Sequence, residues 1–249
     1  MKFFERYLAG DTKAVYDEIE ALDAAAFQPE NIEEIEKVLN ETFSRVAYNL
    51  KVIYKALQEI DYKLKTEFKH SFEKPLQEPF SNTETLLDKL KDAVKPFGYI
   101  PLSLQYFYKY VGGVNFVWDF ENHQEFMWSM ADPIEIFSLD DLTSYITREV
   151  WPQEMQPYIK EKKRSNAFIE LSGDDLHKDN ASGGLMYALM VTTYPSIDSS
   201  FIHSPYQTTF IDYLRICFKY CGFPGIAYPE HKNDYQDFFA IVKPQLKPI

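Results

Sequence analysis

Four side chains that can bind a metal or act in acid–base chemistry lie close together in the C-terminal third of the chain. Asp174, Asp175, His177 and Asp179 place three carboxylates and one imidazole within six residues of a polar, glycine-rich segment, SGDDLHKDNASGG. Such a set can hold a divalent cation, because carboxylate oxygens and imidazole nitrogens are common metal ligands. A metal-dependent hydrolase that uses this segment is therefore one hypothesis for the function.

Other features of the same segment favour a simpler interpretation. The calcium-loop pattern D-x-[DN]-x-[DN]-G is absent, and a catalytic zinc needs ligands fixed on rigid elements. Asp and Asn side chains also bond their own backbone in turns, and Gly183 and Gly184 allow a sharp turn. A protein-contact loop and a plain polar connection thus stand beside the metal hypothesis. Our prediction is that the chain has no metal and no cofactor.

The rest of the sequence has no recognisable catalytic motif. Neither a G-x-S-x-G elbow nor a phosphate-binding loop nor G-x-G-x-x-G follows any predicted strand. The remaining histidines are scattered singly, at His70, His123, His203 and His231. We therefore predict that the protein is not an enzyme and has no catalytic residues.

Three aromatic residues are candidates for contact with a partner. Tyr106, Tyr110 and Trp128 do not fit the apolar helix stripe or strand face of their neighbours, so we expect them at the surface. Tyr and Trp beside acidic residues are suitable anchors in protein interfaces. The complete set of predicted contact residues is Tyr106, Tyr110, Trp128, Asp174, Asp175, His177 and Asp179.

The segment that organises the predicted fold is residues 100–120, IPLSLQYFYKYVGGVNFVWDF. Its first part has apolar residues at helical spacing after Pro101, which suits the first turn of a helix. Gly112 and Gly113 supply a residue able to take a positive φ at the helix end. Residues 114–120 then alternate apolar and polar, which predicts a strand with one buried face.

Similar patterns predict the other elements and an α+β fold, in which a mixed or antiparallel sheet is packed by helices. Helices are expected within residues 4–8, 15–22, 31–60, 83–94, 138–146, 209–221 and 234–242, and strands at 126–130, 134–137, 167–171, 185–191 and 201–203. The mixed run at 151–164 is read as a solvated connection. A composition change near residue 65 divides the chain into a helical extension, 1–65, and an α+β domain, 66–249.

The long helix predicted at residues 31–60 contains no Gly or Pro and carries a wide apolar stripe. The first helices, the rest of the chain or a second copy must cover this stripe. A homo-oligomeric scaffold, with a homodimer formed through this helix, is thus a further alternative for the function.

Composition limits the classes of partner. The chain has 249 residues, and its 26 basic and 38 acidic residues give a net charge of −12, which argues against binding to nucleic acid or anionic membranes. No stretch approaches the length needed to span a bilayer, and the first residues carry charge, so we expect a cytoplasmic protein. Cys217 and Cys221, four apart on a predicted helix, are expected to be reduced core thiols.

The order of several motifs resembles the SUKH superfamily, the Smi/Knr-like immunity and interaction proteins. The matching pieces are IP-x2-L-x2-FY-x3-GG at residues 100–113, the strand with Trp118, DPIEIFSLDDL at 132–142, and TTFIDYLRICFKYCGFPG at 208–225. The resemblance covers the C-terminal two thirds and implies an α+β fold and protein binding. It transfers no catalytic residues.

These observations together predict a noncatalytic protein-binding module. On the resemblance, it is a bacterial immunity protein that neutralises a toxin by direct binding. Its negative charge would draw it to a basic face, such as the substrate groove of a nuclease toxin. Neither the partner nor the oligomeric state follows from the sequence.

Overall fold

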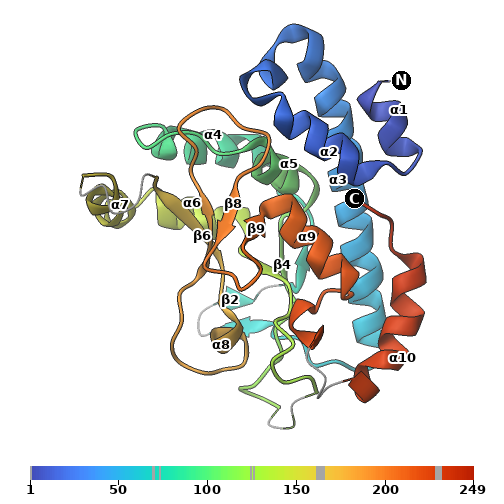
Figure 1. Ribbon diagram of the computed structural model, residues 1–249. Coiled ribbons are helices and arrows are strands. Elements are labelled where there is room, and N and C mark those ends of the chain that lie inside the picture. Colours follow the sequence, from blue (N-terminus) through green and yellow to red (C-terminus); the bar gives the residue numbers. More distant parts are fainter. Residues whose placement is uncertain are drawn as a thin grey trace.

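The computed structural model describes residues 2–68, 71–72, 74–123, 125, 127–160, 166–227 and 232–249 (Figure 1). The predicted fold class is confirmed: helices pack against short antiparallel sheets, and the long N-terminal helix is present. Among the positions discussed above, His70, Phe126, His231 and the last part of the predicted connection, 161–164, lie outside the described residues.

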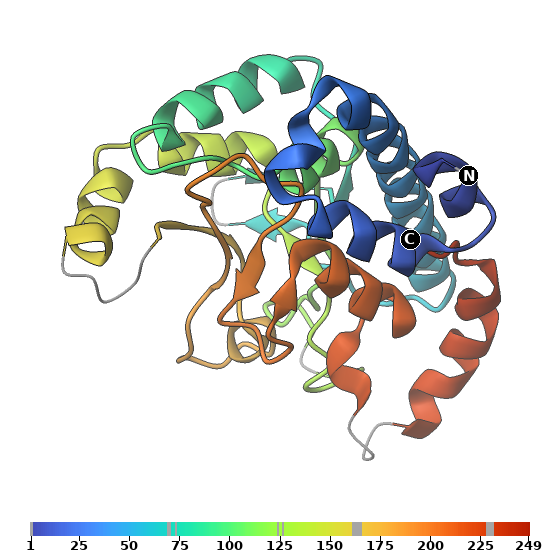
Figure 2. The same cartoon turned by 45° about the horizontal axis from the view of Figure 1, so that its top comes forward.

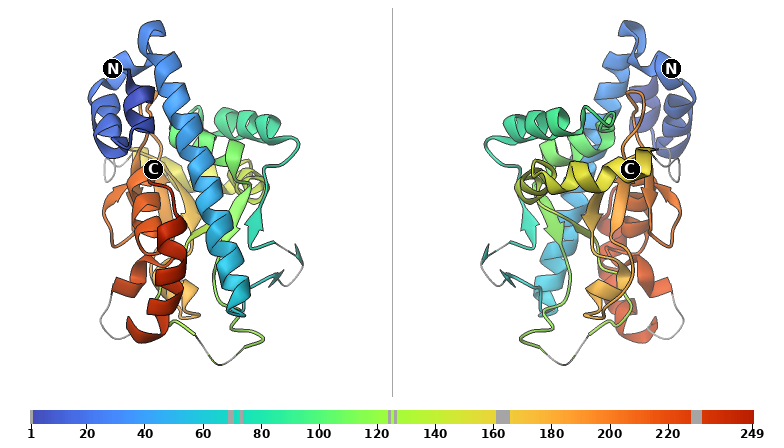
Figure 3. Two further views of the ribbon diagram at one scale, coloured as in Figure 1. Left: turned by 90° about the vertical axis from the view of Figure 1, so that its right-hand side faces the viewer. Right: turned by 90° about the vertical axis from the view of Figure 1, so that its left-hand side faces the viewer.

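Three helices and a 3-10 turn form the N-terminal part. They are α1 (Phe3–Leu8), α2 (Thr12–Ala21), η1 (Asp23–Phe27) and α3 (Pro29–Glu59). Pro29 occupies the first turn of α3, where a missing N–H has no cost, so the helix begins two residues before the predicted start. Figure 3 shows α3 running along the molecule, with α9 and α10 on one side and α4 and α5 on the other.

The remaining helices surround the strands. They are α4 (Thr83–Val94), α5 (Leu102–Tyr110), α6 (Leu139–Ile146), α7 (Val150–Lys160), α8 (Asp175–Lys178), α9 (Phe210–Lys219) and α10 (Lys232–Val242), with 3-10 turns η2 (Pro224–Ala227) and η4 (Lys243–Gln245). In Figure 2, α4 and α6 lie side by side. The solvated connection expected at 151–164 is wrong for its first part, because α7 forms there and buries Trp151 against the Phe97 ring.

Three strands, β4, β5 and β7, are shorter than predicted, and every pairing between the described strands is antiparallel. They are β1 (Glu67–Phe68), β2 (Ser71–Phe72), β3 (Leu76–Gln77), β4 (Gly113–Asn115), β5 (Glu135–Ile136), β6 (Phe168–Ser172), β7 (Tyr187–Met190), β8 (Ser200–Ile202) and β9 (Thr208–Thr209). The described part contains the sheets β1-β2, β3-β4-β5 and β6-β7-β8-β9. A backbone hydrogen bond from the Phe137 N–H to the Leu171 carbonyl, 2.8 Å long, links the second sheet to the third.

The helix-to-strand turn after α5 forms as predicted, but its two glycines act differently from the prediction. Neither Gly112 nor Gly113 is among the residues with positive φ. Instead, the backbone of other segments comes very close: a Cβ on Gly112 would lie 2.2 Å from the Glu78 carbonyl oxygen, and one on Gly113 would lie 2.9 Å from Ser138 Cα. Both positions therefore need glycine for space rather than for backbone angle.

The strand predicted at 114–120 ends at Asn115, and the strand predicted at 126–130 is wrong over the residues that are described. Beyond β4 the chain leaves the sheet and pairs with the segment after α3, where the Asp119 N–H donates to the Lys63 carbonyl at 2.8 Å. Residues 127–130 are turns and bends, and Met130 takes a φ of 56°. The end of β4 is therefore determined by the segments with which the chain pairs, and not by the alternation of apolar and polar residues in the sequence.

The apolar stripe of α3 is covered within the chain. It contacts α1, η1, α5 and α10. Its one buried amide, Asn49, also has partners: it donates to the Lys247 carbonyl and accepts from the Lys247 N–H, both at 2.8 Å, which holds the C-terminal residues along the helix. The stripe that suggested a homodimer is thus occupied by the protein's own elements.

The face of the strands towards α3 is set by alternation. Phe116, just beyond β4, stacks on Tyr54 of α3 with ring centroids 6.1 Å apart, so Val114, two residues earlier, faces the same way. Asn115 and its register partner Glu135 therefore project from the opposite face. This opposite face carries the pocket described below.

Candidate binding site

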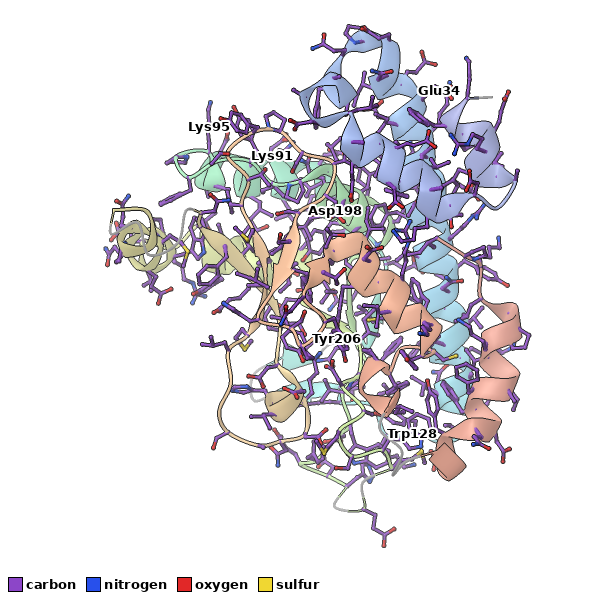
Figure 4. The ribbon with its side chains drawn as sticks, viewed as in Figure 1. Glu34, Lys91, Lys95, Trp128, Asp198 and Tyr206 are labelled. Carbon is purple, nitrogen blue, oxygen red and sulfur yellow. The ribbon has the colours of Figure 1, made fainter. Side chains whose placement is uncertain are left out.

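Two of the three aromatic contact candidates are not at the surface, so their predicted exposure is wrong. Trp128, labelled in Figure 4, is 2% exposed. It lies among the rings of Tyr62, Phe223, Tyr235 and Phe238. These rings come from distant parts of the chain, so local alternation could not reveal them. Trp128 therefore belongs to the core.

The other two aromatic candidates lie on α5. Tyr106 is 7% exposed because its ring packs towards Phe43 of α3, with centroids 6.5 Å apart. Burial raises the pKa of the Tyr106 hydroxyl to about 12. Tyr110 is half-buried, and its hydroxyl donates to Asn40 Oδ1 at 2.8 Å. The structure separates these two tyrosines from Trp128 and brings the three into no common surface.

The polar segment at 172–184 contains one turn of helix, α8. Asp174 is buried and caps it: Asp174 Oδ1 accepts from the His177 N–H at 2.8 Å and lies 2.9 Å from His177 Nδ1. Gly183 and Gly184 take the positive φ values expected for a sharp turn, 121° and 84°. A Cβ on Gly184 would meet the Asp174 carboxylate at 1.8 Å, so the glycine is needed there for space as well.

The other acidic residues of this segment point to different places. Asp175 is exposed, whereas Asp179 is partly buried and accepts from the Met130 N–H and, at 3.4 Å, from the Ser129 hydroxyl. Burial raises the pKa of Asp179 above its ordinary value, opposed by these hydrogen bonds. Within the described ranges no group of three His, Cys, Asp or Glu residues could hold a metal ion. The metal hypothesis for this segment stays a prediction.

A buried ion pair fixes α8 to the core. Lys178 is 2% exposed, and its ammonium donates to Asp132 Oδ1 at 2.7 Å. Asp132 Oδ2 accepts from the Tyr206 hydroxyl at 2.7 Å and from the Tyr187 hydroxyl at 3.3 Å. Tyr206 is labelled in Figure 4. The same ammonium lies 4.6 Å from the centre of the Tyr187 ring. Every charge in this set is paired, so the set reads as structural.

A pocket lined by several acidic side chains lies against α6, on the face of the strands opposite α3. We call it the acidic pocket. Its volume is about 390 Å³. The described residues that line it are Lys74, Gln77, Gly113, Val114, Asn115, Glu135, Ile136, Phe137, Ser138, Asp141, Leu142, Tyr145 and Glu170. Three of these are acidic and one, Lys74, is basic, so the pocket favours a positively charged occupant.

Glu135 enters the acidic pocket from β5. Its Oε2 accepts from the Gly173 N–H at 2.6 Å and from the Ser172 hydroxyl at 3.4 Å. No donor from the described part of the chain bonds to its Oε1. Burial raises the pKa of Glu135, and the nearby charge of Lys178 and the Gly173 hydrogen bond oppose that rise. One carboxylate oxygen is therefore held by backbone and the other is available.

Glu170 enters the acidic pocket from β6, in the middle of an otherwise buried strand. In the part of the chain that the structure describes, its carboxylate accepts no hydrogen bond and forms no ion pair. Burial raises its pKa, and the negative charge of Glu154 adds to the rise. Glu154 itself is occupied, because it accepts from the Tyr145 hydroxyl at 2.9 Å.

A third acceptor completes the polar lining. Gln77 Oε1, from β3, is buried and has no hydrogen-bond partner among the described residues. Asp141 is differently placed: it lies in the first turn of α6, beside the hydroxyl of the capping residue Ser138. The capping arrangement at Ser138 confirms the start predicted for this helix.

The sequence interpretation missed Glu135 and Glu170. A signal was present, because each is a single acidic residue between apolar neighbours, in PIEIF and AFIEL. A charged residue in a strand that is otherwise apolar either faces solvent or has a use in a cavity. Deciding between these needs the spatial neighbours, which come from β3, β4 and α6.

Comparison with known protein families, with curated proteins and with solved structures finds no match for this chain. The resemblance to the SUKH superfamily therefore stays a prediction. In the described residues, no helix combines the length and apolar character required to cross a bilayer.

Proposed function

We propose that the protein is a noncatalytic binding module whose acidic pocket receives a basic partner protein. The observation that carries this proposal is the pair of carboxylates at Glu135 and Glu170. Both are desolvated enough for their pKa values to rise, and both keep at least one oxygen without a hydrogen-bond donor from the described residues. Burying a carboxylate without enough hydrogen bonds or a counter-charge costs free energy. A cationic partner would offset this cost by pairing with the carboxylates.

The whole-chain charge supports the same partner. A net charge of −12 accelerates the encounter with a basic surface, and a pocket that desolvates a cation then slows dissociation. The resemblance to Smi/Knr-like proteins supplies the particular form of the proposal. The protein acts in the bacterial cytoplasm as an immunity protein that neutralises a toxin, such as a nuclease, by direct binding.

The resemblance implies an immunity protein that is encoded beside its toxin, so the test uses the purified product of the neighbouring gene. We expect it to form a stoichiometric complex with this protein in isothermal titration calorimetry and to lose its toxicity when both are expressed together. The association rate should fall several-fold between about 50 and about 300 mM salt, since screening shortens the range of steering. A toxin that is neutralised without forming a complex would contradict the proposal, and so would a complex whose association rate ignores salt.

Paired variants separate the pocket from the overall charge. Glu135→Gln with Glu170→Gln removes two charges in the pocket, and Glu30→Gln with Glu36→Gln removes two charges from exposed positions of α3. Both proteins lose the same net charge, so both lose the same long-range attraction. Only the pocket pair should increase the dissociation rate of the complex. Equal dissociation rates for both pairs would place the contact elsewhere.

A further inference from the structure

We propose that the acidic pocket binds the guanidinium group of one arginine side chain presented by the partner. This inference deepens the proposed function and rests on it. It identifies the chemical group that the partner inserts into the pocket. The inference can be wrong even if the protein does bind a basic partner.

The first argument is the hydrogen-bonding character of the lining. Gln77 Oε1 is buried without a hydrogen-bond partner among the described residues, and within those residues no donor bonds to Glu135 Oε1 or to the Glu170 carboxylate. Arginine matches such a set better than any other side chain, because guanidinium has five N–H donors and no acceptor. A neutral ligand with acceptors of its own would leave these oxygens unpaired.

The second argument is the spread of the acceptors. Gln77 belongs to β3, Glu135 to β5 and Glu170 to β6, so the three side chains border the pocket from three strands. A planar fork with several fixed N–H groups can reach acceptors on different sides at once. The ammonium of lysine is a compact point charge and is more strongly hydrated, so it gains less from the same arrangement.

The third argument is the shape of the pocket and its apolar part. Its volume of about 390 Å³ lies in the lower part of the range for small-ligand pockets, about 300–1,000 Å³, so it suits one side chain and a few waters rather than a folded segment. Phe137 and Leu142 offer apolar contact for the methylene stem, and the Tyr145 ring offers a surface on which guanidinium can stack.

The buried pair near the pocket explains why Glu170 is the better residue for a test. Glu135 already experiences the positive charge of Lys178, which opposes the rise of its pKa. Among the described residues no cation contributes to the pKa change of Glu170, and its neighbour Glu154 adds negative charge. The occupant's charge should therefore matter most at Glu170.

The experiment titrates the full chain with three blocked tripeptides, Gly-Arg-Gly, Gly-Lys-Gly and Gly-citrulline-Gly, followed by amide signals in NMR. The arginine peptide should shift signals of residues 113–115, 135–137 and 168–172. The lysine peptide should bind about tenfold more weakly, and the uncharged citrulline peptide more weakly still, as expected when charge-assisted hydrogen bonds are lost. Glu170→Gln should weaken arginine binding about tenfold, and Glu36→Gln less than twofold.

Three results would overturn the inference, and a fourth would contradict the proposed function. Equal shifts with the arginine and lysine peptides would show that the pocket has no preference for guanidinium. Shifts confined to other elements would show that the peptide binds outside the acidic pocket. Absence of arginine binding, while the neighbouring gene product still binds and the pocket pair of variants still speeds its dissociation, would leave the proposed function and end this inference. Arginine binding without any complex with that gene product would instead contradict the proposed function. Urea unfolding of Glu170→Gln confirms that the variant is folded.

Discussion

At the scale of single residues, the buried Lys178–Asp132 ion pair should be sensitive to the loss of either partner. Lys178→Met leaves Asp132 buried with only the Tyr206 and Tyr187 hydroxyls as donors. Removing one partner of a buried pair typically costs about 3–5 kcal/mol, and we expect a loss of that size in the free energy of unfolding. Urea denaturation measures it.

The control is Lys13→Met, which removes an exposed pair with Asp17 on α2. Exposed pairs contribute about 0–1 kcal/mol, so this variant should unfold almost like the wild type. If Lys178→Met were equally harmless, the ion pair would not be what holds α8 to the core.

The charge of Glu170 should destabilise the folded protein, in contrast to the Lys178–Asp132 ion pair, which stabilises it. Because burial raises its pKa, the folded chain binds this proton more tightly than the unfolded chain does, and the free energy of unfolding falls as pH rises above the ordinary Glu pKa of about 4.3. Glu170→Gln removes that loss. We expect a higher urea midpoint than the wild type at pH 7 and a difference that shrinks towards about pH 4. A lower midpoint at pH 7 would mean that the carboxylate has a stabilising partner.

The residues that carry the site show how far sequence reasoning reaches at this scale. Clustering in the chain drew attention to Asp174 and Asp179, yet the structure uses both carboxylates to hold backbone N–H groups. Glu135 and Glu170 are far apart in the chain and meet only because β5 lies beside β6. Proximity of this kind has no local signature.

At the scale of elements, most helices and the strands β5 to β8 form where the sequence predicts them, whereas α7 was missed and β4 ends earlier than predicted. The periodicity at 31–60 located α3 within two residues at its start, because a helix makes its hydrogen bonds within its own segment. β4 pairs with β3 and β5, which lie far away in the sequence, so its end was set by partners that the alternation does not contain. The two glycines at its start, Gly112 and Gly113, were correctly predicted to be required, but for their backbone angles rather than for space.

The close approach at Gly112 gives a direct test of that reason. Gly112→Ala would place a methyl group 2.2 Å from the Glu78 carbonyl oxygen, so the segment leading out of β3 must move. We expect a loss of about 1–3 kcal/mol in the free energy of unfolding, as for other overpacked sites. Ser144→Ala, at an exposed position of α6, should change it by less than about 0.5 kcal/mol. A harmless Gly112→Ala would show that this packing is loose.

The segment around α8 makes a separate prediction about divalent ions. Its carboxylates are engaged in different places, by the His177 N–H at Asp174 and by the Met130 N–H at Asp179. We therefore expect no change in the melting temperature when calcium, magnesium or zinc is added at millimolar concentration. A rise that disappears in His177→Ala would favour the metal-dependent hydrolase instead.

At the scale of the whole molecule, the N-terminal helices and the strands share one buried cluster. Leu50 of α3 is 0% exposed within the chain itself. Leu50→Lys should therefore unfold or strongly destabilise the protein, because an unpaired charge would enter the core. Circular dichroism and light scattering distinguish this result from the alternative, a folded variant that merely loses a dimer.

At this scale the central claim is that a basic partner binds on the side of the strands opposite α3. The negative charge of the whole chain and the acidic pocket both support it. Hydrogen–deuterium exchange of the protein, free and bound to the neighbouring gene product, tests this claim most directly. We predict protection of residues 113–115, 135–142 and 168–172 on binding. Protection confined to α1–α3 or to the α8 segment, with those three stretches unchanged, would contradict it.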